Sequence, residues 1–420
     1  MTSVNPLLYR GIATRVFLLV AAAMLSSATV ENEYLIAARD LDAKIANSYA
    51  YLDKLPGGQV PQSEVLTAER EAVHDERTLL AYAEKRLISL ADHHAITGSS
   101  FRDSWAVVPT YADIWVVQQG DRLVVDAVRN GSPAEQHGIA AGDTITRIGG
   151  MPAGQAVSMF WERLGMEVTQ ARAEYAARVL VAGRRDRARV ITVQSRSGEV
   201  RELVLPSLYE QEQEARPPVS SCTRDALTVI RFNNSLGDGA TIAAFDEAMA
   251  AVPAGHRLVL DLRDTPSGGN TTVARAIMGW FVSEPRGYQI HNRPAEERET
   301  GIPRQWIEQV LPRRGRYHPH LPTVLVGRWT GSMGEGMAIG FASLGASVEG
   351  TRMAGLLGSV EDLQIGQTDL FVKLPTERLL SVTGSPREAF VPKALAGYAS
   401  RFELKRLGFS EALGCEDEPR

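Results

Sequence analysis

The most informative segment of the sequence is residues 322–340, which read Pro322-Thr323-Val324-Leu325-Val326-Gly327-Arg328-Trp329-Thr330-Gly331-Ser332-Met333-Gly334-Glu335-Gly336-Met337-Ala338-Ile339-Gly340. A short apolar run, a cluster of small residues and a second apolar segment predict a buried strand, a sharp turn and a helix. A serine at such a junction has an accessible side chain, and the helix N-terminus stabilises negative charge that develops there. Ser332 is therefore a candidate nucleophile. A helix N-cap without a catalytic role is the alternative.

A second strand-and-turn unit lies upstream and reads Arg257-Leu258-Val259-Leu260-Asp261-Leu262-Arg263-Asp264-Thr265-Pro266-Ser267-Gly268-Gly269-Asn270. Consecutive glycines at a strand end leave backbone N–H groups bare, which is what binding an oxyanion or a phosphate requires. A phosphate-binding loop would need Gly-Lys-Ser/Thr after four spacers, and no lysine lies nearby. We therefore exclude a nucleotide site and keep Gly268 and Gly269 as candidates for an oxyanion site.

The composition is that of an ordinary globular chain. Its 420 residues, 44% hydrophobic and 23% charged, suffice for two or three domains with buried cores. The net charge is -5 and the sequence contains no cluster of basic residues, which excludes electrostatic binding of nucleic acid. Two cysteines exclude a zinc ribbon, an iron–sulfur cluster and a dense disulfide scaffold. Spacing suggests no metal site, and we expect no cofactor.

The first 28 residues read as a secretory signal peptide. Arg10 and Arg15 precede an apolar run at 16–25, and small residues follow up to Ala28, after which we expect cleavage. The run is shorter than the roughly 20 residues that a membrane span needs, so a permanent anchor is the weaker alternative. We expect a periplasmic or secreted protein without a stable membrane span. Export would permit a Cys222–Cys415 bridge, and two buried free thiols are the alternative.

The pattern between residues 29 and 206 changes from helical to extended. Apolar residues at helical spacing predict a helical cap at 29–100, broken at 55–58 by Leu-Pro-Gly-Gly. From about Asp113 the period changes to two, which predicts short strands at 114–117 and 122–128. Further strands are expected at 190–193 and 200–204, after a helical insertion that contains Met159, Phe160 and Tyr175.

The stretch at 130–150 reads Asn130-Gly131-Ser132-Pro133-Ala134-Glu135-Gln136-His137-Gly138-Ile139-Ala140-Ala141-Gly142-Asp143-Thr144-Ile145-Thr146-Arg147-Ile148-Gly149-Gly150 and resembles the core of a PDZ domain. Gly138 can take the left-handed C-cap of a short helix, and Gly142-Asp143 can make the following turn. We therefore assign 112–206 to a PDZ domain with an atypical helical insertion. Such domains bind extended chain ends at a sheet edge, which indicates a peptide partner.

Strands alternate with helical stretches from Leu227 onward, which predicts an α/β domain at 220–410, followed by a polar tail at 411–420. The order of a PDZ core, Asp-Leu-Arg-x-x-x-x-Gly-Gly and a strand ending in Gly-Ser-x-x-Glu resembles the carboxyl-terminal processing and tricorn-type serine peptidases over roughly residues 85–400. The resemblance implies a crotonase-like α/β protease core, with Ser332 as nucleophile. It also implies that Gly268-Gly269 shape the oxyanion hole and that Glu335 belongs to the helix after the serine.

One departure from that family concerns the general base. The processing peptidases use a lysine about 25 residues after the serine, where this chain has Leu356-Leu357, and none of its six lysines has that spacing. The tricorn-like branch takes a histidine from just before the PDZ domain, and Leu90-Ala91-Asp92-His93-His94 resembles its Leu-x-Asp-x-His segment. His94 is then the base, with His93 as neighbour or substitute.

The acidic residue that orients the base would be Glu388, in a segment that partly matches Glu-x-x-Gly-Val-x-Pro but lacks its glycine. A carboxylate there would fix the tautomer of the imidazole and stabilise the imidazolium. A solvated loop charge is the alternative for Glu388.

The sequence predicts an exported serine peptidase that acts on unfolded or terminal peptide segments. Ser332 would attack the scissile carbonyl, His94 would take its proton, and N–H groups at Gly268-Gly269 and Met333 would hold the oxyanion. The rival is a non-catalytic protein that kept the fold, lost its base and binds peptides through the PDZ domain. A third alternative is an esterase on a crotonase-like core. The sequence leaves open whether the chain forms oligomers.

Overall fold

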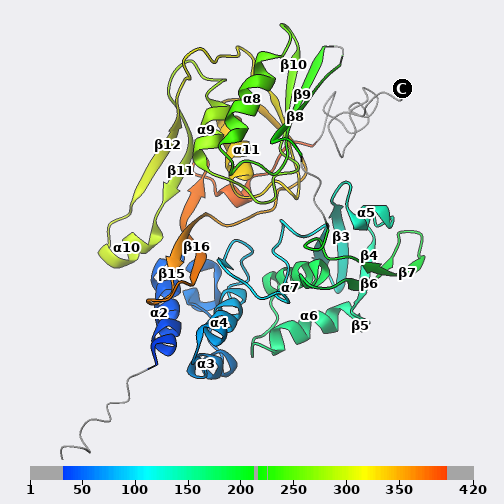
Figure 1. Cartoon of the computed structure of the whole chain (residues 1–420), viewed down its shortest axis with the longest axis vertical. Coiled ribbons are helices and arrows are strands. Elements are labelled where there is room, and N and C mark those ends of the chain that lie inside the picture. Colours follow the sequence, from blue (N-terminus) through cyan, green and yellow to red (C-terminus); the bar gives the residue numbers. More distant parts are fainter. Residues whose placement is uncertain (1–31, 212–215, 225, 395–420) are drawn as a thin grey trace, which may run out of the picture.

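The structure is a computed structural model that describes residues 32–211, 216–224 and 226–394. Three lobes surround a common centre, and Figure 1 shows one of them above the other two. The upper lobe holds α8, α9 and α11, the lower left one α2–α4, and the lower right one β2–β7 with α5–α7. The α/β class predicted from the sequence is confirmed.

The upper lobe is built on a five-stranded sheet in the order β14-β13-β10-β9-β8. Strands β9, β10, β13 and β14 are parallel, and β8 pairs antiparallel with β9 at the edge. The strands span β8 Val219–Arg224, β9 Leu227–Phe232, β10 Arg257–Asp261, β13 Thr323–Val326 and β14 Ser347–Gly350. The helices of this lobe span α8 Ala240–Ala250, α9 Thr271–Met278 and α11 Met333–Ser343.

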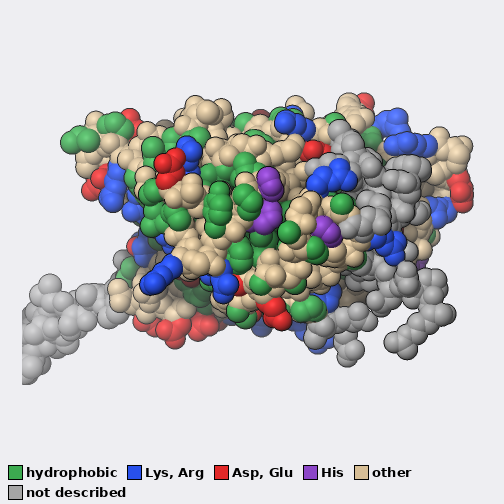
Figure 2. Space-filling view, turned by 90° about the horizontal axis from the view of Figure 1, so that it is seen from above, with side chains coloured by type: hydrophobic (Ala, Val, Ile, Leu, Met, Phe, Trp, Pro, Cys, Tyr) green, Lys and Arg blue, Asp and Glu red, His purple; other side chains and the backbone are tan. Residues whose placement is uncertain are grey.

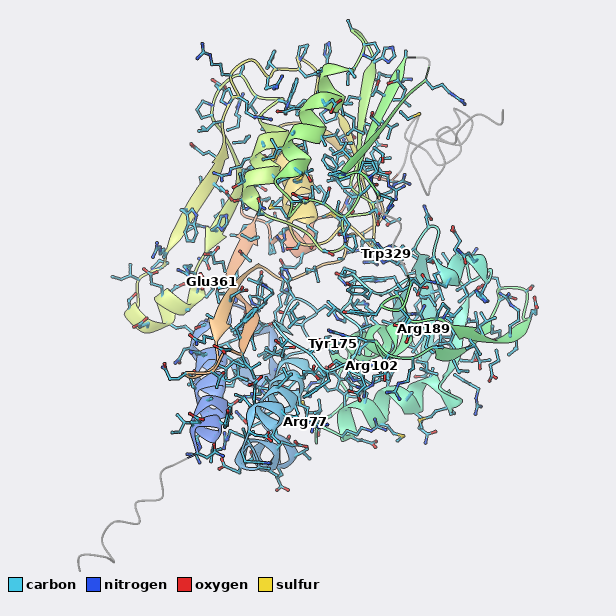
Figure 3. The ribbon with its side chains drawn as sticks, viewed as in Figure 1. Arg77, Arg102, Tyr175, Arg189, Trp329 and Glu361 are labelled. Carbon is cyan, nitrogen blue, oxygen red and sulfur yellow. The ribbon has the colours of Figure 1, made fainter. Side chains whose placement is uncertain are left out.

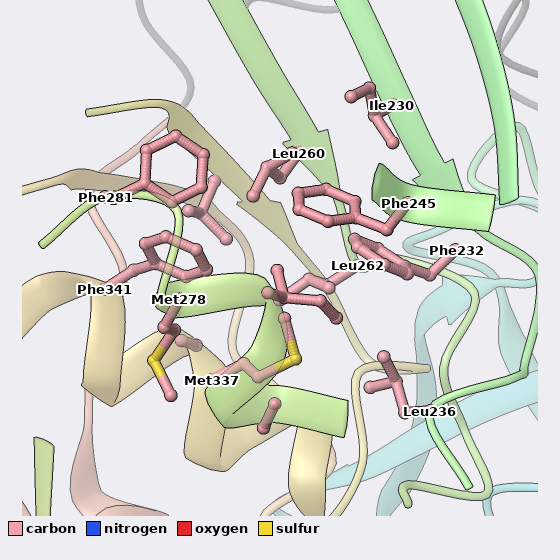
Figure 4. Packing of buried hydrophobic residues seen from close by; sticks show 14 of the residues in the cluster. Ile230, Phe232, Leu236, Phe245, Leu260, Leu262, Met278, Phe281, Met337 and Phe341 are labelled. Carbon is pink, nitrogen blue, oxygen red and sulfur yellow. The ribbon is translucent and has the colours of Figure 1, made fainter. Parts of the chain in front are cut away.

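The core of the upper lobe lies between this sheet and its helices. Phe232 and Leu260 from the sheet meet Phe245 of α8 and Met337 and Phe341 of α11 in one buried cluster (Figure 4). Strands β9, β10 and β13 are buried at nearly every position because both of their faces are covered, as is usual for parallel strands. This packing holds β10 and β13 rigidly side by side.

A second sheet joins the upper lobe to the N-terminal helices. Its order is β1-β16-β11-β12, and β15 also pairs with β16. The elements span β1 Ile96–Thr97, β11 Arg286–Asn292, α10 Pro294–Thr300, β12 Gln305–Val310, β15 Ser359–Gln364, β16 Phe371–Leu380 and η3 Arg387–Ala389. Helices α2 Glu33–Ser48, α3 Glu64–Glu71 and α4 Glu76–Ile88 follow the predicted helical pattern, with the short turns η1 Leu52–Lys54 and η2 Pro56–Gly58 between α2 and α3. Leu41 and Leu79 of these helices share a buried cluster with Val372 and Leu374 of β16.

The lower right lobe is a six-stranded sheet in the order β2-β3-β4-β6-β7, with β5 paired to β4. Its elements span β2 Ile114–Gln119, β3 Arg122–Val128, α5 Pro133–Gln136, β4 Thr144–Ile148, β5 Met151–Pro152, α6 Ala153–Glu162, α7 Gln170–Ala182, β6 Arg189–Gln194 and β7 Val200–Leu205. The strands predicted here are confirmed, and α6 and α7 lie where helical stretches were predicted. Gly138 has the expected positive φ, +72°.

The upper lobe and the lower right lobe meet at Trp329. Its indole Nε1–H donates to the Ala112 carbonyl at 2.7 Å, and its ring shares a buried cluster with Trp115, Ala182 and Leu356. Figure 3 shows Trp329 at this junction. The residues that follow β13 are thus packed directly against the β2–β7 lobe.

Several sequence predictions fall outside the described residues or on the surface. The signal peptide at 1–28, residues 395–410 of the α/β domain, the tail at 411–420 and Cys415 lie outside them, so the cleavage and the Cys222–Cys415 bridge stay predictions. Cys222, on β8, is not a free thiol.

Within the described part, no helix has the length and apolar character to cross a membrane. Figure 2 shows the end of the upper lobe, where blue and red side chains are interspersed and form no broad basic field.

A buried charge cluster ties β11 to β12 and β16. His291 approaches Glu377 with Nδ1 at 2.8 Å and Glu308 with Nε2 at 3.1 Å, and its ring stacks on Trp306. Burial lowers the pKa of His291, but the hydrogen bonds to the two carboxylates outweigh that effect and raise it to about 9. The imidazolium therefore links three strands of the second sheet.

Replacing His291 should remove part of the pH dependence of the free energy of unfolding. A pKa raised in the folded state stabilises the protein fully below the ordinary pKa of about 6.5, and the effect is lost as the pH rises through about 9. We expect the free energy of unfolding of the wild type to fall by roughly 2 kcal/mol more between pH 6 and 9.5 than that of His291→Gln. Urea unfolding at the two pH values measures this, with His320→Gln as an exposed control. An equal fall in all three proteins would contradict the prediction.

Candidate active site

The turns after β10 and β13 meet because these parallel strands are neighbours and end at the same edge of the sheet. The Thr265 N–H donates to the Trp329 carbonyl at 2.9 Å, and the Gly331 N–H donates to the Thr265 carbonyl at 3.2 Å. A Cβ atom built on Gly268 would lie only 2.5 Å from the Cβ of Ser332. The two segments singled out in the sequence therefore form one site.

Gly268 and Gly269 are required for different reasons. Gly268 has a φ of +66° and lies directly against Ser332, whereas a side chain on Gly269 would collide with the backbone of Leu236. The Gly268 N–H donates to the Thr265 carbonyl at 3.1 Å and is thus engaged inside its own turn. The Met333 N–H is the first of α11 and has no acceptor within the helix. Of the predicted oxyanion donors, the Gly268 N–H is thus engaged in its own turn, whereas the Met333 N–H is not used by the helix.

Ser332 itself adopts a strained backbone conformation. Its φ of 48° and ψ of -109° are unusual for a residue with a side chain, and the structure has only three such positive φ values outside glycine in its described part. The residue is partly exposed at the N-cap of α11, as the sharp turn predicted from the sequence requires. Strain of this kind persists only where surrounding contacts hold it.

The contact that holds the turn is the buried carboxylate of Glu335. Its Oε2 accepts the Ser332 N–H at 2.9 Å and the Leu356 N–H at 3.2 Å, and its Oε1 accepts the Gly355 N–H at 2.8 Å. Burial raises the pKa of Glu335 to about 7, although Arg387 and these three N–H groups act in the opposite direction. At neutral pH the carboxyl is therefore divided between its neutral and charged forms.

His94 lies on the other side of segment 355–357. Its Nδ1 is 2.7 Å from the Leu357 carbonyl, which can only accept, so Nδ1 carries the proton and Nε2 is left with its lone pair. Burial lowers the pKa of His94 to about 4, so the ring is neutral at pH 7. No hydrogen bond joins His94 to Ser332 within the described residues. The two are connected through segment 355–357, which contacts His94 at one end and Glu335 at the other.

Asp92 is a site residue that the sequence reasoning did not single out. Its Oδ1 accepts the His94 N–H at 2.9 Å, its Oδ2 accepts the Tyr49 hydroxyl at 2.9 Å, and burial raises its pKa to about 6. It therefore fixes the backbone from which His94 projects. The Asp-x-His spacing was the signal that could have identified it.

The other predicted site residues lie elsewhere. His93 stacks on Tyr175 of α7 with ring centroids 4.4 Å apart, and Figure 3 labels Tyr175. Glu388 pairs with Lys54 at 2.6 Å, and no hydrogen bond joins it to His94 in the described part of the chain. The structure thus brings Ser332, Gly268 and Met333 together, places His94 one segment away, and leaves Glu388 bound to a lysine.

The residues of the site do not suggest a bound metal. Across the described ranges, no group of three or more His, Cys, Asp or Glu side chains is arranged to hold a metal ion. The chemistry available at this site is that of a hydroxyl, an imidazole, a buried carboxyl and backbone N–H groups.

Comparison with known proteins identifies the fold of this chain. No family model and no curated protein sequence matches the chain. Among solved structures, the photosystem II D1 C-terminal processing protease superimposes with a TM-score of 0.56 at 18% identity, over 92% of this chain and 99% of that chain. The chain has the fold of a C-terminal processing protease. Mature CPAF in complex with lactacystin shares this protease fold, with a TM-score of 0.53 at 14% identity over 86% and 94% of the two chains.

Within this protease fold, the buried carboxyl of Glu335 should make stability pH-dependent. Because its folded pKa of about 7 lies above the ordinary 4.5, the folded state loses stability as the pH rises from about 4.5 through 7. We expect the free energy of unfolding to fall between pH 5 and 8 by roughly 3 kcal/mol more in the wild type than in Glu335→Gln. Urea titrations at both pH values measure the difference. Glu299→Gln, at an exposed position, should behave as the wild type, and a Glu335→Gln protein with an unchanged fall would contradict the assignment.

Proposed function

We propose that the chain is an exported serine endopeptidase that cleaves unfolded or terminal peptide segments by acyl-enzyme chemistry. The observation that carries the proposal is the contact of Gly268 with a strained, partly exposed Ser332 at the start of α11. The protease fold supports it, since the same edge of the sheet carries both turns. In this reading the upper lobe is a crotonase-like core at 220–410.

The proposed reaction begins with attack by the Ser332 hydroxyl on the scissile carbonyl. His94, neutral and with Nε2 unprotonated, takes the hydroxyl proton and later gives it to the leaving amine. The Met333 N–H, at the positive end of α11, holds the oxyanion together with the turn at Gly268-Gly269. Hydrogen bonds between nucleophile and base are often long without substrate, so closure of segment 355–357 completes the site.

Two groups would orient His94. The Leu357 carbonyl already fixes the tautomer in which Nε2 is the acceptor. Glu388 would become the orienting carboxylate of the closed site by exchanging Lys54 for His94. The missing lysine of the processing peptidases is thereby replaced by an imidazole from the N-terminal cap at 29–100.

The other lobes would deliver the substrate. We assign 112–206 to a PDZ domain whose sheet edge binds an extended peptide, with α6 and α7 as its helical insertion. The signal peptide proposed for 1–28 would direct the chain to the periplasm or the exterior, without a stable membrane span after cleavage. The partner is then a peptide or protein, not nucleic acid, and assembly into oligomers is a separate question.

A non-catalytic peptide-binding protein is the second candidate. It is favoured by the leucines at the lysine position and by the burial that lowers the pKa of His94 to about 4, which makes this imidazole a weak base. Covalent labelling and pH dependence separate the two candidates.

Ser332→Ala should abolish reaction with a fluorophosphonate probe and lower casein cleavage by at least about 10,000-fold, because the nucleophilic oxygen is removed. Intact-mass spectrometry after labelling measures the adduct. Ser267→Ala, in the adjacent turn and exposed, is the matched control and should label as the wild type. An adduct that persists in Ser332→Ala would overturn the assignment of the nucleophile.

His94 should set the acid limb of the pH–rate profile. Because its pKa is lowered to about 4, we expect kcat/KM to rise through about pH 4 rather than through the usual value near 6.5. His94→Ala should lower kcat/KM by about 1,000-fold, whereas His93→Gln should change it by less than about 10-fold. Peptide cleavage rates from pH 3 to 9 test both statements. If His94→Ala retained wild-type kcat/KM, another base would have to act.

A further inference from the structure

A polar cavity of about 180 Å³ adjoins the Ser332 turn. Glu335 lines it, and the same carboxyl accepts the Ser332 N–H, so the cavity begins on the far side of the group that holds the nucleophile. Four arginines from separate parts of the chain line its wall: Arg178, Arg328, Arg352 and Arg387. Such a concentration of guanidinium groups beside a candidate active site calls for a ligand of opposite charge.

Two of the four arginines have partners outside the cavity. Arg178 pairs with Glu174 at 2.7 Å, and Arg328 pairs with Asp126 at 2.6 Å. Their guanidinium groups lie 4.7 and 5.2 Å from the centre of the Trp115 ring. These contacts fix the two side chains and give the wall an aromatic surface.

The other two arginines have no carboxylate partner within 4 Å in the described ranges. Arg387 is only 2% exposed, donates from one nitrogen to the carbonyls of Leu356 and Gly358 at 2.9 Å each, and leaves its buried Nε without any partner. Arg352 is exposed and forms the rim of the cavity. A buried guanidinium without a counter-charge is unfavourable unless a ligand supplies the charge.

The acids that line the cavity do not cancel this charge. Glu388 is neutralised by Lys54 at 2.6 Å. Glu335 has a pKa raised to about 7 by burial, so at neutral pH it is only partly ionised and its oxygens are occupied by backbone N–H groups. The cavity therefore keeps an excess of positive charge.

We propose that this cavity binds a carboxylate of the peptide substrate and so gives the protease a preference for acidic peptides. Arg387 would bind the carboxylate from inside and Arg352 from the rim, since the planar guanidinium matches a carboxylate in two parallel hydrogen bonds. Trp115, Met353 and Phe390 supply apolar surface for the carbon chain that carries it. The carboxylate comes either from an Asp or Glu side chain or from the free C-terminus of the peptide. This proposal rests on the proposed peptidase function.

The test measures peptide binding to the full chain carrying Ser332→Ala, in which no cleavage can occur. Three probes are compared by calorimetry: acetyl-Ala-Ala-Glu-Ala-Ala-Ala-amide, the same peptide with Gln in place of Glu, and the Gln peptide with a free carboxyl end. We expect at least one of the two charged peptides to bind about 10-fold more tightly than the neutral one. A gain for the Glu peptide identifies the side chain as the source, and a gain for the free end identifies the terminus.

The second variant separates this cavity from any other site that binds chain ends. Arg352→Gln lies at the exposed rim, so it should leave the fold intact while it removes the preference. Arg314→Gln, an exposed arginine outside the cavity, is the matched control and should keep it. Equal affinities for the three probes, no detectable binding of any of them, or a preference that survives Arg352→Gln would overturn the proposal.

This experiment can fail independently of the peptidase assignment. Fluorophosphonate labelling of Ser332 without any charge preference would leave the enzyme and remove the cavity's role. A charge preference that depends on Arg352, in a protein that does not label, would leave the carboxylate site on a non-catalytic binding protein.

Discussion

The site depends on one interaction, the buried carboxyl of Glu335 with its three backbone donors. It accepts N–H groups from Ser332, Gly355 and Leu356, and so joins the turn after β13 to segment 355–357. Without an acceptor at this place, three backbone N–H groups would lose their partner, and the positive φ of Ser332 would lose the contact that holds it. The raised pKa of the Glu335 carboxyl reflects the free energy that it costs to bury a charge at this position.

The second constraint is that three lobes meet around the candidate site. The upper lobe contributes Ser332, the N-terminal helices contribute His94, and the β2–β7 lobe contributes Trp115 and Arg178 to the adjoining cavity. Segment 355–357 lies where the three meet, because it contacts Glu335 on one side and His94 on the other. Small shifts of this segment would therefore change the surroundings of His94 and of the Ser332 turn together.

Local patterns in the sequence identified the elements that form the site. The apolar run before Gly327 and the small residues around Ser332 predicted a strand, a turn and a helix, and β13 and α11 lie there. The period of two at 122–128 and the helical spacing around Met159 likewise predicted β3 and α6. These predictions of strands and helices were correct because hydrophobic periodicity and turn residues act over a few neighbouring positions. The partner of Glu388 was not predictable in this way, since Lys54 is more than 300 positions away in the chain.

Local patterns were enough to predict the strand, turn and helix around Ser332, the paired glycines at 268–269, and the absence of a lysine at the place where a processing peptidase has its base. The folded chain was needed to show that Gly268 touches Ser332, that His94 donates to Leu357 rather than to Glu388, and that four arginines share one cavity. This difference arises because backbone geometry follows from nearby residues. Burial, pKa values and charge partners follow from which distant segments pack together, and no local pattern encodes that.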